Sequence, residues 1–200
     1  YTVKAEVEGL DPGRHYYYRF QALGAVSQTG RTLTLPVGPV DRFVVAACSC
    51  SNYPAGYFNA YRAMAQTDDI DVVLHLGDYI YEYEAAGYAS ARARELHRES
   101  VPGHEVVSLH DYRLRHAQYK SDADLQAVHA RHPFIVSWDD HESANDAWRD
   151  GAQHHDARIS SMNSPRVAAS RLKVPRMAEV TISEPCFWTP RIIMQKWLPS

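Results

Sequence analysis

The sequence predicts an α/β protein in which a parallel sheet follows a small β region. Residues 43–48 (FVVAAC) and 72–76 (VVLHL) read as buried strands, and residues 56–66 between them have helical spacing of apolar side chains. Such a strand, helix and strand unit favours a parallel pair joined by a right-handed crossover. The first 36 residues instead alternate apolar and polar side chains, which is typical of half-buried strands.

The β region covers residues 1–36. Val3, Ala5 and Val7 alternate with charged residues, and the DPG turn at 11–13 precedes a second alternating stretch rich in aromatic residues. The pattern L-x-P-G-x-x-Y-x-Y-R-F over residues 10–20 resembles the end of a fibronectin type III-like β-sandwich domain. Its strands are too few to close a sandwich, so we expect only part of such a domain.

A linker rich in proline and glycine is predicted at residues 37–41, followed by an α/β domain over residues 42–155. Residues 109–119 read as a helix, and residues 121–132 as another that begins with a capping-box-like Ser121 and Asp124. FIVSW at 134–138 reads as the third buried strand.

Two further segments have weak periodicity. Residues 83–108 are rich in Ala, Arg, Glu and His, and we expect a long excursion over the active face. Residues 156–200 carry five prolines and basic clusters, and we expect a divergent or aberrant tail.

Composition limits the class of protein. The 200 residues have a net charge of −3, without the basic excess typical of a nucleic-acid-binding module, and the apolar runs are too short for a membrane segment. The three cysteines form no disulfide framework. The first residue is Tyr1 rather than Met, so we expect a mature form or a fragment without a signal peptide in view.

Chemically active side chains follow all three predicted strands. Cys50 follows the first, Asp78 and Tyr81 follow the second, and Asp140 and His141 follow the third. Because ligands bind outside the carboxyl ends of parallel strands in open α/β sheets, we expect these side chains to share one edge. This set of donors predicts a metal site, and paired metals about 3.5–4 Å apart are a known device for phosphoryl transfer.

Each of these residues also has a structural interpretation. Gly77-Asp78 can be a simple turn, Asp139–Glu142 a solvated helix start, and Cys50 a small buried hydrophobe. Tyr81 is one of thirteen tyrosines. The agreement of three strand ends favours the metal site over these separate explanations.

Two longer motifs carry a family resemblance. HLGDYIYE and WDDHE, together with CSN and the stretch DYRLRHAQYKSDADLQAVHARHPFIVSWDDHE, resemble the PhoD-like alkaline phosphatases of the calcineurin-like metallophosphoesterase superfamily. The likeness runs from about residue 1 to about residue 155. It implies part of a metallophosphatase-type sheet sandwich behind the β domain, and hydrolysis of phosphate mono- or diesters by metal-activated water.

The resemblance also implies roles for single residues. Asp78 would bridge two metals, and Tyr81 would be a phenolate ligand of an iron-type site. Cys50 stands where many superfamily members have aspartate, and Asp140 takes the place of a metal-binding asparagine. His141 would stand over the substrate, stabilising the transferring group or protonating the leaving oxygen.

The resemblance also implies iron and calcium as cofactors. The residue chemistry agrees, because thiolate and phenolate suit a transition metal and carboxylates suit a hard cation such as calcium. We expect Glu142 or Asp139 to orient the ring of His141, and Asn52 and Arg113 to be weaker candidates for contacts with a phosphate-ester substrate. Export to the periplasm or the extracellular space is expected from the family alone.

The sequence departs from the family pattern in one respect. The superfamily takes further metal-binding histidines from a Gly-Asp-x-His motif, and these 200 residues contain none; we do not assign His154 or His155 as ligands. Two alternatives therefore stay open beside the enzyme. One is a catalytically inactive, truncated remnant that binds at most a metal or a partner. The other is a β-domain adhesion or binding module with an appended α/β segment.

Overall fold

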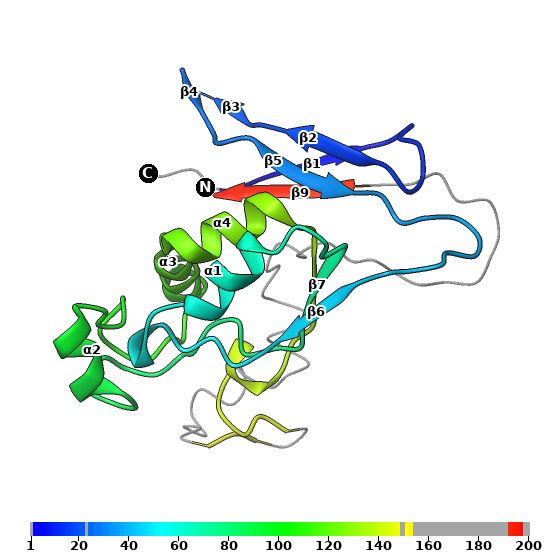
Figure 1. Cartoon of the computed structure of the whole chain (residues 1–200). Helices are drawn as coiled ribbons and strands as arrows, with labels where there is room; N and C mark the ends of the chain where they lie inside the picture. The colour runs from blue at the N-terminus through cyan, green and yellow to red at the C-terminus, as the bar shows by residue number, and fades with distance from the viewer. Residues whose placement is uncertain (1, 23, 149–150, 154–191, 198–200) are drawn as a thin grey trace.

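The structure is a computed structural model that describes residues 2–22, 24–148, 151–153 and 192–197. It contains a small β region above a parallel sheet with its helices (Figure 1). The prediction of an α/β protein with a parallel sheet is confirmed.

The parallel sheet has three strands in the order β6-β7-β8: β6 (Val45–Cys48), β7 (Val72–His75) and β8 (Phe134–Val136). Both pairs are parallel, with Cys48 opposite His75 and His75 opposite Val136. These three strands therefore end at one edge of the sheet. The crossover between β6 and β7 contains α1 (Asn59–Gln66), as the helical spacing predicts.

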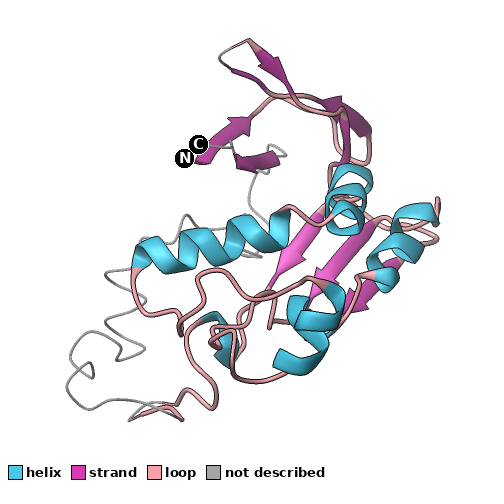
Figure 2. Ribbon diagram, turned by 90° about the vertical axis from the view of Figure 1, so that its left-hand side faces the viewer, coloured by secondary structure: helices cyan, strands magenta, loops and turns pink. Residues whose placement is uncertain are grey.

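Three more helices and two short 3₁₀ helices complete the described α/β part (Figure 2). α2 (Ser90–Leu96) lies within the stretch expected to be an excursion, α3 (Leu109–Lys120) and α4 (Ala123–Arg131) precede β8, and η1 (Tyr53–Ala55) and η2 (Asp140–Glu142) follow β6 and β8. No helix in the part of the chain that the structure describes is long and apolar enough to cross a membrane.

The predicted start of α4 is wrong by one residue. Asp122, not Ser121, is the N-cap, because its Oδ1 accepts hydrogen bonds from the backbone N–H groups of Asp124 and Leu125 at 2.9 and 3.1 Å. Ser121 instead ends α3. A true capping box begins α3, where Ser108 and Asp111 satisfy each other's backbone N–H groups.

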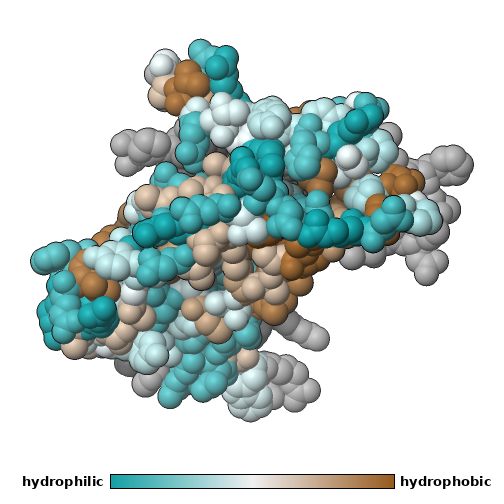
Figure 3. All heavy atoms as spheres, in the orientation of Figure 1, coloured by the Kyte–Doolittle hydropathy of each residue, from teal (hydrophilic) through white to brown (hydrophobic). Residues whose placement is uncertain are grey.

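The core of the α/β part lies between the helices and the sheet. Val73 of β7, Tyr119 of α3 and Val128 of α4 are fully buried, and Tyr61 of α1 is 3% exposed. Burying one such side chain contributes roughly 1.5–3 kcal/mol, so this layer fixes the sheet against the helices. Apolar side chains also gather on the surface near β6, where Val45 is 49% exposed (Figure 3).

The β region consists of antiparallel pairs. β2 (His15–Tyr18) pairs with β5 (Gly30–Leu33), and the short β3 (Gln21–Ala22) pairs with β4 (Ala25–Val26). Gly30 lies opposite Tyr18, and a Cβ atom at this position would overlap the tyrosine ring. The strands themselves agree with the sequence, while the fibronectin type III-like sandwich stays a prediction.

One pairing was not predicted. β1 (Thr2–Val7) pairs antiparallel with β9 (Ile192–Trp197), from Thr2 opposite Trp197 to Val7 opposite Ile192. The two strands lie side by side in Figure 1. Part of the segment expected to be aberrant is thus a strand; His154, His155 and most of that segment lie outside the described residues.

The β region contacts α4 through polar groups. Arg31 Nε donates to the carbonyl oxygen of Arg131 at 3.1 Å, Gln28 Nε2 donates to that of Gln126 at 3.3 Å, and Tyr18 Oη to that of His129 at 3.5 Å. The carbonyls of His129 and Arg131 lie in the last turn of the helix, where carbonyls lack helical partners.

Candidate metal centre

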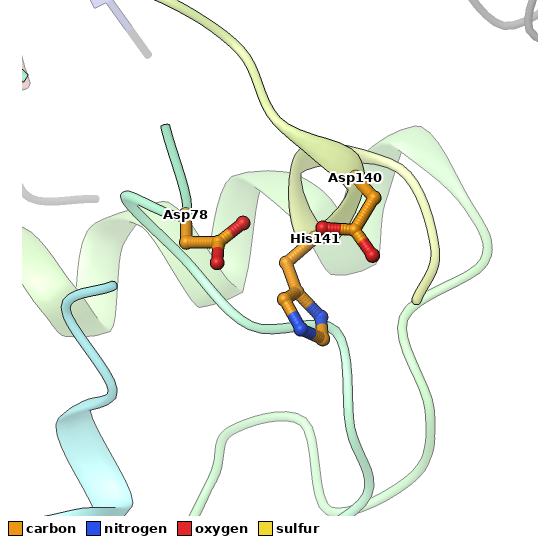
Figure 4. A group of neighbouring side chains, drawn as sticks. All are labelled: Asp78, Asp140 and His141. Carbon is orange, nitrogen blue, oxygen red and sulfur yellow. The ribbon is translucent and has the colours of Figure 1, made fainter. Parts of the chain in front are cut away.

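Two predicted metal ligands and the predicted catalytic histidine meet at the carboxyl edge of the parallel sheet. Asp78 follows β7, while Asp140 and His141 lie in η2 after β8. One ligand atom from each lies within 4.8 Å of the others. In Figure 4 the carboxylate of Asp78 faces the two side chains of η2.

Cys50 and Tyr81 approach the same carboxylate. Cys50 Sγ is 3.5 Å from Asp78 Oδ2, and the Tyr81 hydroxyl donates to that oxygen at 3.3 Å. Burial and the nearby charge of Asp78 raise the pKa of Tyr81, which holds its hydroxyl in the protonated form when no cation is bound. The structure therefore gathers all five residues that the strand ends indicate, although their roles as ligands stay predictions.

The turns that carry Cys50 and Asp78 have unusual backbones. Both residues lie in the left-handed region, with φ of 58° and 54°. The turns bind each other, because the N–H of Cys50 donates to Gly77 O at 3.2 Å and that of Ser51 to Asp78 O at 2.8 Å. Left-handed backbone in residues other than glycine costs on the order of 1–3 kcal/mol, and such strain persists where surrounding contacts hold it.

Gly77 is required by both conformation and space. Its φ is 117°, and a Cβ atom there would lie 2.5 Å from Asp139 Cβ and 2.6 Å from Asp139 N. The absence of a side chain allows the turn after β7 to reach the segment that leads into η2. This close approach brings Asp78 within reach of Asp140 and His141.

Glu142 joins these two segments and does not orient His141, as we had expected it or Asp139 to do. Its carboxylate accepts from the backbone N–H groups of Asp78 at 3.0 Å, Tyr79 at 2.5 Å and Asp139 at 2.7 Å. Burial raises the pKa of Glu142 despite these bonds. The carboxylate of Asp139 also binds backbone rather than His141, because Asp139 is the N-cap of η2 and accepts a hydrogen bond from the N–H of Asp140.

Glu82 orients His141 instead. Its Oε2 accepts from His141 Nδ1 at 2.8 Å, and its Oε1 accepts from the N–H of Asn145 at 2.6 Å. Burial alone would lower the pKa of His141. The hydrogen bond and charge of Glu82, together with the charges of Asp140 and Asp78, outweigh this effect, so the pKa is raised above its ordinary value. Sequence reasoning missed Glu82, although its carboxylate belongs to the HLGDYIYE motif, four residues after Asp78.

The buried imidazole of His75 contacts both the turn that carries Asp78 and the turn that carries Cys50. His75 Nδ1 accepts from the N–H of Gly77 at 3.3 Å, while Nε2 lies 3.0 Å from Ser51 Oγ and 2.9 Å from the Tyr61 hydroxyl. Ser51 and Tyr61 also share a hydrogen bond. Burial, helped by Lys120, lowers the pKa of His75 to about 4, so the neutral ring can accept on one side and donate on the other.

Asn52 and Arg113, the two weaker candidates for substrate contacts, have different surroundings in the structure. Asn52 lies two residues beyond Cys50 at the start of η1, and its Oδ1 is buried with no hydrogen-bond partner among the described atoms. Arg113 is an exposed residue of α3. Within the described residues, no hydrogen bond or ion pair connects Arg113 to the ligand group.

The residues present fit a cation. Asp78 Oδ1 is buried and has no hydrogen-bond partner in the part of the chain that is described. The loss of hydration of this carboxylate oxygen is therefore not offset by a hydrogen bond. Asp78 and Asp140 bring like charges together, which is unfavourable in a partly buried site without a cation. Thiol, phenol, carboxylate and imidazole are all established metal ligands.

The fold and this group define an α/β protein with a potential metal-binding site at the carboxyl ends of its parallel strands. Family models agree in detail: the PhoD-like phosphatase model matches residues 43–172, and the model of the PhoD-like phosphatase N-terminal domain matches residues 1–36. The chain belongs to the PhoD-like phosphatase family.

Two known proteins show the extent of the likeness. Alkaline phosphatase D of Bacillus subtilis (strain 168) is 45% identical over 147 residues, which are 72% of this chain and 24% of that protein. A solved structure of PhoD superposes with a TM-score of 0.75 at 39% identity, covering 89% of this chain and 34% of the other. The chain thus spans about a quarter of the length of the curated relative and a third of the solved one.

Proposed function

We propose that this chain carries part of the centre of a metal-dependent phosphoesterase that hydrolyses phosphate mono- or diesters. The observation that supports it best is the meeting of Asp78, Asp140 and His141 at the carboxyl edge of the sheet, in a chain of the PhoD-like phosphatase family. The relative's name, alkaline phosphatase D, supports a phosphate ester as substrate.

Four side chains would hold the metal ions. Asp78 is central, because Cys50 and Tyr81 both contact its Oδ2 and Asp140 lies within 4.8 Å of it. We propose iron at the sulfur and phenol side and calcium with the carboxylates, since soft and hard donors prefer these ions. Bound cations would supply a water of lowered pKa and neutralise charge on the phosphoryl oxygens.

His141 is the proposed group that acts on the ester. Its Nδ1 is held by Glu82, so Nε2 is free to face the substrate, and the raised pKa favours the protonated ring. In that form it donates a hydrogen bond to a phosphoryl oxygen or a proton to the leaving oxygen. The buried Oδ1 of Asn52 supports a role for that amide near the ligand group, while Arg113 has no such support.

We assign the rest of the chain in line with this function. Residues 1–36 would be the end of a fibronectin type III-like β domain, 37–41 a linker, 42–155 the first part of the metallophosphatase sheet sandwich, and 156–200 a divergent tail that returns one strand to β1. Export is proposed as for the family.

Metal content and turnover test the proposal. We expect the purified chain to retain metal by mass spectrometry, and Asp78→Ala to lose it. Asp69→Ala, at an exposed residue paired with Arg42, is the control that keeps metal. Hydrolysis of p-nitrophenyl phosphate and its bis-ester at alkaline pH is the second readout.

The outcomes separate the enzyme from an inactive remnant. A folded chain with metal and no turnover indicates a metal-binding remnant. A chain that folds but takes up no metal contradicts the proposed centre, and so does an Asp78→Ala variant that keeps its metal.

A further inference from the structure

A strip of tyrosine rings leads away from the candidate metal centre. The Tyr81 ring lies 4.2 Å from the imidazole of His141, and the Tyr83 ring lies 5.2 Å from it in an edge-to-face arrangement. Tyr83 is 6.2 Å from Tyr81, and Tyr88 is 5.9 Å from Tyr83. Three rings thus form a continuous path from His141 outward.

Core packing does not explain the outer part of this strip. Tyr88 is 65% exposed and Tyr83 is half-buried, and neither belongs to the buried core cluster. Tyr83 also lies beside the ligand group, since its ring packs edge-to-face against the imidazole of His141. The two rings therefore stand at the rim of the candidate centre.

We propose that Tyr83 and Tyr88 form a subsite for a planar aromatic group of the phosphate ester, either an aryl alcohol or a nucleobase. This inference depends on the proposed function, because the ester's phosphoryl group must lie at Asp78, Asp140 and His141. The rings of Tyr81 and Tyr83 both lie beside the imidazole of His141, and Tyr81 is a proposed metal ligand. A group esterified to the phosphate and extending past His141 would therefore meet the ring of Tyr83.

The chemistry of the rim favours an aromatic group over a charged or aliphatic one. Tyrosine faces stack on any planar π system, and each stacked base typically adds about 5- to 150-fold in affinity. A second negative charge would lie near the carboxylate of Asp140, which is within 4.8 Å of the His141 ring nitrogen in the ligand group. An aliphatic alcohol would gain no stacking with the two rings.

Equilibrium binding tests the subsite without requiring turnover. The chain loaded with iron and calcium is titrated with phenylphosphonate and methylphosphonate, which carry the same head group and resist hydrolysis, and binding is followed by calorimetry. We expect phenylphosphonate to bind about 10-fold more tightly, as stacking on one ring predicts. Adenosine monophosphate and glycerol phosphate form a second pair, which separates a nucleobase from a simple aryl group.

Variants connect this preference to the two rings. We expect Tyr88→Leu to lower the phenyl-to-methyl ratio several-fold and Tyr83→Leu to bring it near one, while Tyr83→Phe keeps it. Tyr17→Leu, at a tyrosine of β2 that is 73% exposed, is the matched control and keeps the full ratio. Because Tyr88 is exposed, its variant keeps the test valid even if Tyr83→Leu fails to fold.

The possible failures are distinct. If both phosphonates bind equally, or if the ratio survives Tyr88→Leu and Tyr83→Leu, the subsite is wrong and the phosphoesterase centre stands. If neither phosphonate binds the metal-loaded chain, the proposed function is wrong and the subsite falls with it.

Discussion

Glu82 and His141 form a buried pair in which the carboxylate Oε2 lies 2.8 Å from the imidazole Nδ1. The side chains come from different strand ends, one four residues after Asp78 and the other in η2. Glu82 is 1% exposed, so the contact fixes both the tautomer and the direction of the ring. The segment after β7 therefore supplies both Asp78 of the candidate centre and Glu82, which positions His141.

Replacement of Glu82 by glutamine should lower the pKa of His141. The variant keeps an acceptor for Nδ1 but removes the negative charge that contributes to the raised value, so the imidazole pKa should fall. The measurement is an NMR titration of the metal-free chain, with His141→Asn used to assign the resonance. An unchanged titration would show that the charge of Glu82 does not control this ring.

Gly77→Ala should destabilise the fold and separate the turn after β7 from the segment that leads into η2. The added methyl would enter Asp139, and the positive φ adds strain on the order of 1–3 kcal/mol. Urea denaturation measures the loss. Gly56→Ala is the control, because a Cβ atom there meets nothing within 4 Å and the backbone is extended. Equal stability of the two variants would contradict the close approach at Gly77.

Asp122→Ala should cost about 3–5 kcal/mol of unfolding free energy, since it leaves a buried guanidinium unpaired. Asp122 Oδ2 binds Arg98 Nη1 at 2.8 Å with both side chains under a tenth exposed, and Oδ1 caps α4. Asp69→Ala removes an exposed ion pair with Arg42 and should leave chemical denaturation unchanged. A small effect of Asp122→Ala would show that Arg98 finds another partner.

Folding stability should rise with pH between about 7 and 9.5 because of Lys120. Burial lowers its pKa from 10.5 to about 7, beside the neutral Tyr79 and His129, so in this window the unfolded chain binds a proton that the folded chain does not. Lys120→Met should flatten this slope in urea denaturation. A slope that persists in the variant would assign the effect to another group.

The strand ends were predictable because parallel strands place their carboxyl ends together. Three buried runs and the polar residues after them were sufficient to bring Cys50, Asp78 and Asp140 to one edge. The partners of backbone N–H groups were not predictable in the same way. Glu142 binds three amides and Asp122 caps α4, and both facts depend on exact turn geometry.

Contacts between residues far apart in the sequence were also not predicted. Glu82 is a charged residue in a loop pattern, and only the fold shows that it faces His141, 59 positions later. The pairing of β1 with β9 joins segments almost 200 residues apart, and no local pattern indicates which strands become neighbours. Local periodicity describes elements, whereas these contacts depend on their assembly.

Two main-chain hydrogen bonds, from Cys50 to Gly77 and from Ser51 to Asp78, join the ligand turns without any side chain. Backbone hydrogen bonds therefore set the spacing between the Cys50 sulfur and the Asp78 carboxylate. An aspartate in place of Cys50 would put an oxygen atom at that position and leave the hydrogen bonds between the two turns in place.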